Sequence, residues 1–333
     1  MTPDKLRISI LELATVTSDS SISETFNKSL DLARKAEEFG YTRFWLAEHH
    51  NMISIASSAT AVLIGHIAGG TQKIRVGSGG IMLPNHSPLI VAEQFGTLGS
   101  LYPGRIDLGL GRAPGTDQVT AHAIRPDRMQ AILQFPEQVN EIRQYFSSEN
   151  SHAKVRATVA EGVDVPIYIL GSSTDSAKLA AKMGLPYAFA SHFAPGQLFE
   201  ALDIYYNQFQ PSSVLEKPYV IACINIIVAD TDQKAEKIST SMIRMIFGVL
   251  TNQMDYMQEP TEMTQELRLL YQNPVFQQMA KYSFIGSPHT VYEKTQQFLN
   301  ETGADELMVV SHIYDHEDRI KSYRLFAEMF RKV

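Results

Sequence analysis

The hydrophobic positions of this chain alternate between two spacings from one end to the other. Short apolar runs, several of them with every second residue apolar, predict strands, and apolar residues three and four apart predict amphipathic helices. The strands are predicted at 7–13, 41–46, 73–79, 105–110, 166–170, 187–190, 219–228 and 306–310. Helices are predicted between and after them, at 22–39, 56–68, 88–101, 127–146, 174–183, 195–209, 288–302 and 315–330.

Two local signals fix the ends of the first helix. Ser21 and Glu24 have the spacing of a capping box, in which each side chain bonds the other residue's backbone N–H. Gly40 stands where a helix commonly ends in a left-handed residue. We therefore expect this helix to begin after Ser21 and to end before Gly40.

Eight strands that alternate with helices predict a (β/α)8 barrel, or TIM barrel, formed by one domain spanning residues 1–333. Additional helices are expected between the seventh and eighth strands, over residues 231–281. An open, doubly wound sheet is the alternative, because alternation alone does not show that the sheet closes.

Composition narrows the class of protein. Of 333 residues, 44% are hydrophobic and 20% are charged, and the formal net charge is -7, which argues against nucleic acid as a main partner. The single cysteine, Cys223, lies in an apolar run and is expected to be a buried packing residue. No apolar leader follows the first five residues and no apolar stretch is long enough to span a membrane, so we expect a cytoplasmic protein.

Polar and ionisable residues follow most of the predicted strands. The carboxyl ends of the strands of a (β/α)8 barrel meet at one rim, where barrel enzymes carry their active sites. We therefore expect these side chains to gather around one site. They are Glu48, His49, His50, Arg112, Ser172, Ser173, His192 and His312.

The segment from Gly171 to Ser176 joins a predicted strand to a predicted helix. Backbone N–H groups at a helix N-terminus, together with the hydroxyls of Ser172, Ser173 and Ser176, form an arrangement that binds anions such as phosphate. Arg112, on the neighbouring strand end, is placed to contact the same anion. Simple N-capping is the alternative interpretation of the hydroxyl residues.

Two glycine-containing segments need separate interpretations. Gly79 and Gly80 follow the third strand, where residues without Cβ permit close approach of a planar ligand or a tight bend. Gly109 and Gly111 form a Gly-x-Gly, but Pro114 follows where a helix should begin. We therefore predict a phosphate site without a nicotinamide-binding domain.

Five ordered motifs together resemble the bacterial luciferase-like flavin-dependent monooxygenases. The similarity extends from about residue 7 to residue 326 and therefore covers nearly the whole chain. The motifs are Trp-Leu-Ala-Glu-His-His at 45–50, Val-Gly-Ser-Gly-Gly-Ile-Met-Leu-Pro-Asn-His-Ser-Pro at 76–88, Pro-Gly-Arg-Ile-Asp-Leu-Gly-Leu-Gly-Arg at 103–112, Gly-Ser-Ser at 171–173 with Gly-Leu-Pro at 184–186, and Gly-Ser-Pro-His-Thr-Val at 286–291.

The resemblance implies a (β/α)8 barrel that uses reduced FMN and O2 to oxygenate a small organic substrate. It assigns the flavin phosphate to Arg112 and to the loop of Gly171, Ser172, Ser173 and Ser176, and it implies a non-prolyl cis peptide at Gly79–Gly80, behind the flavin ring. His49 matches the histidine assigned to proton transfer, and Glu48 and His50 are its expected supporting residues. His86, His192 and His312 are candidates for the substrate pocket. No metal is expected.

The resemblance also implies partners and leaves alternatives open. A homodimer and a separate flavin reductase are expected. Ser172 and Gly111 replace the acidic residue and reactive cysteine of luciferase itself, so we expect no light emission. The alternatives are a non-catalytic flavin-binding protein of the same fold, a deazaflavin (F420)-dependent oxidoreductase and a metal-dependent barrel hydrolase. The last is disfavoured because adjacent residues such as His49 and His50 point to opposite sides of a strand.

Overall fold

The computed structural model describes residues 6–330 and confirms the predicted barrel. All ladders of the sheet are parallel, and pairing between β8 and β10 closes it, with Leu307 opposite Ala222 and Met308 opposite Cys223. The barrel strands, in order around the barrel, are β10 (Glu306–Val310), β1 (Arg7–Glu12), β2 (Arg43–Leu46), β3 (Arg75–Ser78), β5 (Ile106–Gly111), β6 (Ile167–Gly171), β7 (Tyr187–Phe189) and β8 (Val220–Val228).

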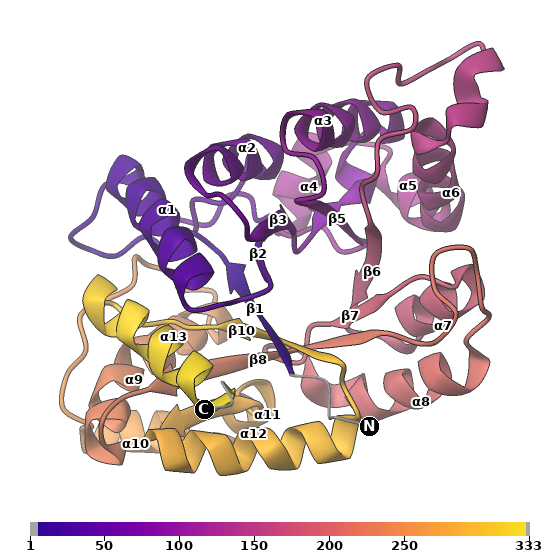
Figure 1. Ribbon diagram of the computed structural model, residues 1–333. Coiled ribbons are helices and arrows are strands. Elements are labelled where there is room, and N and C mark those ends of the chain that lie inside the picture. Colours follow the sequence, from indigo (N-terminus) through magenta and orange to yellow (C-terminus); the bar gives the residue numbers. More distant parts are fainter. Residues whose placement is uncertain (1–5, 331–333) are drawn as a thin grey trace.

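Helices form a layer around the outside of the barrel (Figure 1). The main apolar core lies between this layer and the strands, because strand residues such as Ile10, Leu108 and Val309 pack against helix residues such as Leu32 and Phe326. The helices of this layer are α1 (Ile22–Glu38), α2 (Thr60–Gly70), α3 (Pro88–Leu101), α6 (Phe135–Phe146), α7 (Thr174–Met183), α8 (Leu198–Gln208), α12 (Pro288–Thr302) and α13 (His316–Phe330). Between residues 6 and 330, no helix combines the length and the apolar character needed to cross a bilayer. The predicted lack of a leader at 1–5 concerns residues outside the described range.

The end signals of α1 are confirmed. Ser21 caps the helix through a reciprocal capping box with Glu24. Gly40, with φ +78°, adopts the left-handed conformation directly after the C-cap residue Phe39.

Some element boundaries differ from the prediction. The predicted helix 127–146 is two helices, α5 (Arg128–Leu133) and α6, because Pro136 has no N–H to donate and restricts the residue before it. The predicted helix 56–68 begins only at Thr60. The pattern did not predict the short strands β4 (Ile81–Met82) and β9 (Ser283–Gly286), which extend the ladders of β5 and β8, or the short helices η1 (Leu83–Asn85), η2 (Ser148–His152) and α4 (Gln118–Ile124). The predicted helix 195–209 begins with one short 3-10 turn, η3 (Pro195–Gln197), which continues into α8.

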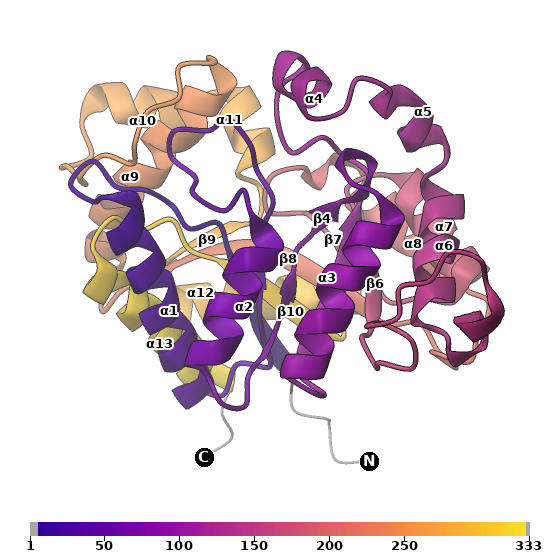
Figure 2. The ribbon, with the colours of Figure 1, turned by 90° about the horizontal axis from the view of Figure 1, so that it is seen from above.

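Two groups of short helices flank the end of the barrel that carries the carboxyl-terminal ends of the strands (Figure 2). On one side are α4 and α5, which follow β5. On the other side are α10 (Gln265–Tyr271) and α11 (Pro274–Met279), which belong to the predicted insertion and follow α9 (Asp232–Leu250).

A buried ionic network fills the opposite, amino-terminal end of the barrel. Arg43 donates from Nε and Nη2 to Glu306, at 2.8 and 3.0 Å, and from Nη1 to Asp107 Oδ2 and the Tyr168 hydroxyl, at 2.8 and 2.7 Å. Trp45 Nε1 also donates to Asp107 Oδ2, at 3.0 Å. Burial lowers the pKa of Arg43, but the charges of Glu306 and Asp107 more than offset it and raise the pKa overall. The network therefore holds charges buried and fixes the indole of Trp45.

Candidate active site at the barrel mouth

An apolar cavity lies inside the carboxyl-terminal end of the barrel, and we call it the barrel mouth. Its walls come from strand residues that point toward the barrel axis, and its one imidazole belongs to His192. The lining residues are Leu11, Trp45, Gly79, Leu170, Ala188, Phe189, Ala190, His192, Ile221, Cys223 and Met308. Cys223 is buried, as predicted, and burial raises the pKa of its thiol well above the ordinary value. The cavity suits a largely apolar ligand.

Glu48 is a buried carboxylate that collects hydrogen bonds from four groups. Its oxygens accept from His50 Nε2 at 2.9 Å, from His86 Nε2 at 2.9 and 3.0 Å, from Asn85 Nδ2 at 3.1 Å and from the Met82 N–H at 2.9 Å. An ionised carboxylate has no proton to donate, so both imidazoles carry a proton on Nε2. Burial alone would raise the pKa of Glu48, but the hydrogen bonds from His50 and His86 lower it to about 2. Glu48 therefore orients His50, His86 and Asn85.

The low pKa of Glu48 predicts a pH-dependent contribution to stability. An unfolded glutamate has a pKa of about 4.3, so the folded carboxylate contributes about 3 kcal/mol above that pH, and this contribution is lost as the pH falls toward 2. Glu48→Gln should be less stable than the wild type at pH 7, and the gap should narrow below about pH 4.5. Denaturant unfolding at pH 7 and pH 3.5 measures it, with the exposed Glu328→Gln as the control. An equal gap at both pH values would contradict the assignment.

His49 has one engaged ring nitrogen and one free one. Nδ1 lies 3.2 Å from the Gly115 carbonyl oxygen, which can only accept, so the proton is on Nδ1 and the Nε2 lone pair is available. Burial lowers the pKa of His49 below its ordinary value, and the ring is therefore neutral at pH 7. Gly115 is itself constrained, because it has φ +68° and an added Cβ would lie 2.5 Å from the Glu48 carbonyl oxygen. His49 thus presents a neutral, oriented base.

His192 lines the mouth and follows β7, and His312 follows β10. Within residues 6–330, the buried Nδ1 atom of each ring has no hydrogen-bond partner. Burial, followed by the electrostatic influence of His312 and His49, lowers the pKa of His192 to about 3. Burial and the charge of Arg319 lower the pKa of His312 to about 3 as well. These neutral rings leave polar atoms without a partner among the described residues, which a ligand could use.

The Gly79–Gly80 peptide bond is cis, as the resemblance implies. An added Cβ at Gly79 would lie 2.8 Å from Leu11 and 3.1 Å from the Trp45 Cβ. An added Cβ at Gly80 would lie 2.8 Å from the Gly109 carbonyl oxygen. The space beside this pair is therefore closed to any larger residue.

Arg112 and the N-terminus of α7 lie together at the rim of the barrel. Arg112 Nη2 is 3.3 Å from Asp175 Oδ2, in the first turn of α7. Ser173 is the N-cap residue of α7, but among the described residues its side chain makes no capping hydrogen bond. The first N–H groups of α7 are therefore open to a ligand, next to a guanidinium.

One predicted contact of this loop differs in the structure. The Ser176 hydroxyl donates to the Ser173 carbonyl oxygen at 2.7 Å and lies 3.0 Å from the Tyr187 hydroxyl. The Ser176 proton is therefore used within the loop and is not available to an anion, in contrast to the prediction for this hydroxyl. The exposed or half-buried positions of Ser172 and Ser173 leave their hydroxyls accessible.

Two residues of the site were missed from the sequence. Asn85 bridges Glu48 to the Pro114 carbonyl oxygen, to which its Nδ2 donates at 3.0 Å. Arg128 is buried and donates to Asn85 Oδ1 at 3.1 Å and to the Arg112 carbonyl oxygen at 3.1 Å. Asn85 lies in a quoted motif and Arg128 in a short basic stretch, but their partners are distant in sequence. Within residues 6–330, no three His, Cys, Asp or Glu side chains form a group that could hold a metal ion.

Comparisons with known proteins agree with this geometry. A family model described as luciferase-like monooxygenase matches residues 6–306. A luciferase-like monooxygenase of Escherichia coli (strain K12) is 48% identical over 329 residues, which cover 99% of this chain and 98% of that protein. An N-acetyl-S-alkylcysteine monooxygenase of Bacillus subtilis (strain 168) is 38% identical over 250 residues, 72% of this chain and 74% of that protein.

Solved structures show the same fold. The crystal structure of apo-MsnO8 has a TM-score of 0.89 and 34% identity, and the match covers 98% of both chains. The oxygenating constituent of 3,6-diketocamphane monooxygenase from Pseudomonas putida, in complex with FMN, has a TM-score of 0.70 at 18% identity, and the match covers 97% of both chains. An F420-dependent secondary alcohol dehydrogenase, in complex with an F420-acetone adduct, has a TM-score of 0.71 at 17% identity, and the match covers 98% of this chain and 100% of that chain. These two likenesses support the fold alone.

Proposed function

The chain belongs to the luciferase-like monooxygenase family, and we propose that its barrel mouth binds reduced FMN and uses O2 to oxygenate a small organic substrate. The observation that carries this proposal is the uncapped N-terminus of α7 beside Arg112, at the rim of an apolar cavity. An anion-binding rim next to an apolar pocket fits a ligand with a phosphate at one end and a flat ring at the other.

The phosphate of FMN is assigned to the rim. Arg112 exchanges its contact with Asp175 for the phosphate, to which its guanidinium can donate two parallel hydrogen bonds. Gly171, Ser172 and Ser173 supply backbone N–H groups and hydroxyls, while Ser176 holds the loop in shape through the Ser173 carbonyl. The helix dipole of α7 adds a favourable interaction with negative charge.

The flavin ring is assigned to the cavity wall formed by Gly79, Gly80 and Trp45. Gly79 and Trp45 line the cavity, and the contacts that exclude a Cβ at Gly79 and Gly80 keep this part of the wall free of side chains. Bound reduced flavin supplies two electrons to O2, so that one oxygen atom enters the substrate and the other leaves as water. The apolar lining limits the access of water to this chemistry.

The histidines are assigned to proton transfer and to hydrogen bonding with the substrate. His49 holds or moves a proton at Nε2, and Glu48 positions His50 and, through His86 and Asn85, the segment that borders the mouth. His192 and His312 accept from or donate to a polar group of the substrate through their unpartnered Nδ1 atoms. His86 bonds both Glu48 oxygens and is placed at the edge of the substrate pocket.

The proposal also covers partners, domain organisation and location. A separate flavin reductase is expected because the Gly-x-Gly at Gly109 opens no helix for a dinucleotide. Exposed apolar side chains at Val62, Ile90 and Leu101, on neighbouring helices α2 and α3, favour a homodimer. One domain over residues 1–333 and a cytoplasmic location complete the proposal.

The single tryptophan of the sequence provides the test of cofactor choice. Trp45 lines the mouth, so a flavin bound there should quench its fluorescence. Anaerobic titration with reduced FMN should give saturable quenching, and reduced F420 should give much less. The loaded protein, supplied with air and a panel of thioethers (N-acetyl-S-alkylcysteines included), ketones and aldehydes, should consume O2 faster with one substrate class. Tighter binding of F420, or O2 uptake that no substrate changes, would contradict the proposal.

Arg112→Ala tests the phosphate assignment. Loss of a charge-assisted, bidentate contact should lower the affinity for reduced FMN by about tenfold to a hundredfold in the same titration. Riboflavin, which has no phosphate, should bind the variant and the wild type equally. Arg156→Ala, which removes an exposed arginine paired with Glu161, is the control and should change neither affinity. Unchanged FMN affinity in Arg112→Ala would remove Arg112 from the flavin site.

A further inference from the structure

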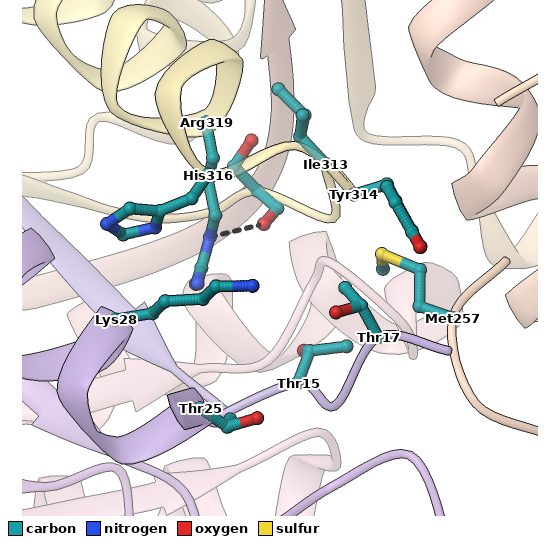
Figure 3. A pocket seen from close by; sticks show the side chains of 10 residues that line it. Thr15, Thr17, Thr25, Lys28, Met257, Ile313, Tyr314, His316 and Arg319 are labelled. Carbon is teal, nitrogen blue, oxygen red and sulfur yellow. Dashed lines mark hydrogen bonds between the residues drawn. The ribbon is translucent and has the colours of Figure 1, made fainter. Parts of the chain in front are cut away.

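A second pocket lies outside the barrel, between α1 and α13, and we call it the α1–α13 pocket (Figure 3). Loops after β1 and β10 form its floor, and Met257 from the insertion covers one side. Its lining residues are Thr15, Thr17, Thr25, Lys28, Met257, Ser311, Ile313, Tyr314, His316 and Arg319. Both ribbon views place α1 and α13 on the side of the barrel away from α7, so this pocket is distinct from the proposed phosphate rim.

The walls of the pocket consist largely of hydrogen-bond donors. Five hydroxyl groups, one amine, one guanidinium and one imidazole line it, and none of the described lining residues carries a carboxylate. A polar cavity lined by donors and by cations, without acidic groups, matches the chemistry of an anion.

The carboxylates nearest the pocket already have partners. Glu12 is paired with the buried Arg319 and accepts from Ser29 at 2.8 Å. Asp31 lies 2.9 Å from His316 Nε2, and Asp19 accepts the Thr17 hydroxyl at 2.6 Å. These contacts neutralise Arg319 and, when it is protonated, His316, so neither supplies the free charge of the pocket.

Lys28 and Ser311 retain unused donors. The Lys28 amine points into the space between Arg319, Thr15 and Thr17 (Figure 3). Its recorded hydrogen bond goes to the neutral Ser20 hydroxyl, at 2.5 Å, and within residues 6–330 it forms no ion pair, although Asp19 and Glu24 feel its charge. Ser311 is 2% exposed, and its Oγ has no partner among the described residues. A buried hydroxyl without a partner is costly, and a ligand would satisfy it.

We propose that the α1–α13 pocket is a second binding site, separate from the flavin site, for a small inorganic oxyanion such as phosphate. Lys28 supplies the charge, and the Ser311 and Thr15 hydroxyls donate to the oxygens. Thr17, Thr25 and Tyr314 are engaged with Asp19, the Ser21 carbonyl and Ser18, and they shape the walls. Because Ser311 directly precedes His312, the bound anion lies next to the segment after β10 that carries His312.

Phosphate titration of Arg112→Ala, and of three further substitutions in that background, tests the site. Arg112→Ala removes the main contact of the rim, so any remaining saturable binding of phosphate reports on the α1–α13 pocket. In that background, Lys28→Met should lower the affinity for phosphate on the order of tenfold, and Ser311→Ala should lower this affinity by several fold. Lys35→Met, which makes the same change on an exposed turn of α1, should leave it unchanged. Calorimetry or the phosphate-dependent rise in unfolding temperature measures the affinity, and circular dichroism confirms that each variant is folded.

The outcomes are distinct. Two phosphate sites in the wild type, one in Arg112→Ala, and one that is weakened on the order of tenfold in Arg112→Ala/Lys28→Met support the proposal. Loss of all saturable binding in Arg112→Ala alone overturns it, because the pocket then binds no phosphate. Equal affinity in Arg112→Ala and Arg112→Ala/Lys28→Met overturns it as well, because Lys28 then makes no contribution.

Discussion

His49→Ala is expected to lower kcat by about a hundredfold to ten-thousandfold while leaving the affinity for reduced FMN nearly unchanged. The ring is neutral at pH 7, and its Nε2 lone pair is free because Nδ1 donates to Gly115. Since burial lowers the pKa of His49, the wild-type rate should fall on the acid side, below the ordinary histidine pKa of about 6.5. That limb of the pH profile should be absent from the variant.

The pH profile separates proton transfer from a structural role. A residue that only packs would change the rate equally at all pH values. His289→Ala is the matched control, because His289 is an exposed histidine of α12 whose Nε2 lies 3.5 Å from Glu293, and its loss should leave kcat unchanged. If His49→Ala retains the wild-type rate, or retains the acid limb at a lower rate, His49 is excluded as the proton-transfer group.

Arg43→Met is expected to cost about 3–5 kcal/mol of unfolding free energy. It removes the cation that neutralises Glu306 and shares Asp107 with Arg75, and both carboxylates are fully buried. Glu306 would keep only the Ser9 and Tyr219 hydroxyls as partners. Urea unfolding measures the effect, and the Trp45 emission should shift because its partner Asp107 is disturbed.

Two further variants bracket this prediction. Arg43→Lys retains the charge but loses the planar guanidinium that reaches both carboxylates. Its free energy of unfolding should lie between those of the wild type and Arg43→Met. Arg324→Met removes an exposed pair with Glu328 and should change stability by less than about 1 kcal/mol. A cost of that small size for Arg43→Met would show that the network contributes little to the stability of the barrel.

Local signals predicted most of the fold. Ser21, Glu24 and Gly40 act within one helix, and the apolar spacing of each strand is a property of that strand alone, so pattern and structure agree there. The break near Pro136 was missed because the apolar spacing continues through it. The strands β4 and β9 were missed because two and four residues are too few to show a period.

The residues of the candidate site also fall into two groups: those that local patterns predict and those that only tertiary packing brings together. Its first residues could be found because they follow strands, and the barrel topology brings strand ends together. The partners of Glu48 could not, because Met82 and His86 lie 34 and 38 positions away and their contacts depend on the packing of β2 against β3. Arg43, Asp107 and Glu306 lie within strands whose apolar neighbours conceal them, and only closure of the sheet brings them together. The contact of Arg128 with Asn85 requires the packing of α5 against η1, which the sequence does not show.

Incorporation of labelled oxygen tests the central claim most directly. The protein is loaded anaerobically with reduced FMN and mixed with ¹⁸O₂ and the substrate class that accelerates O2 uptake, and the product is analysed by mass spectrometry. We expect one ¹⁸O atom in each product molecule when the water is unlabelled. Product that carries no ¹⁸O, or that takes its oxygen from labelled water, would contradict a monooxygenase site at the barrel mouth.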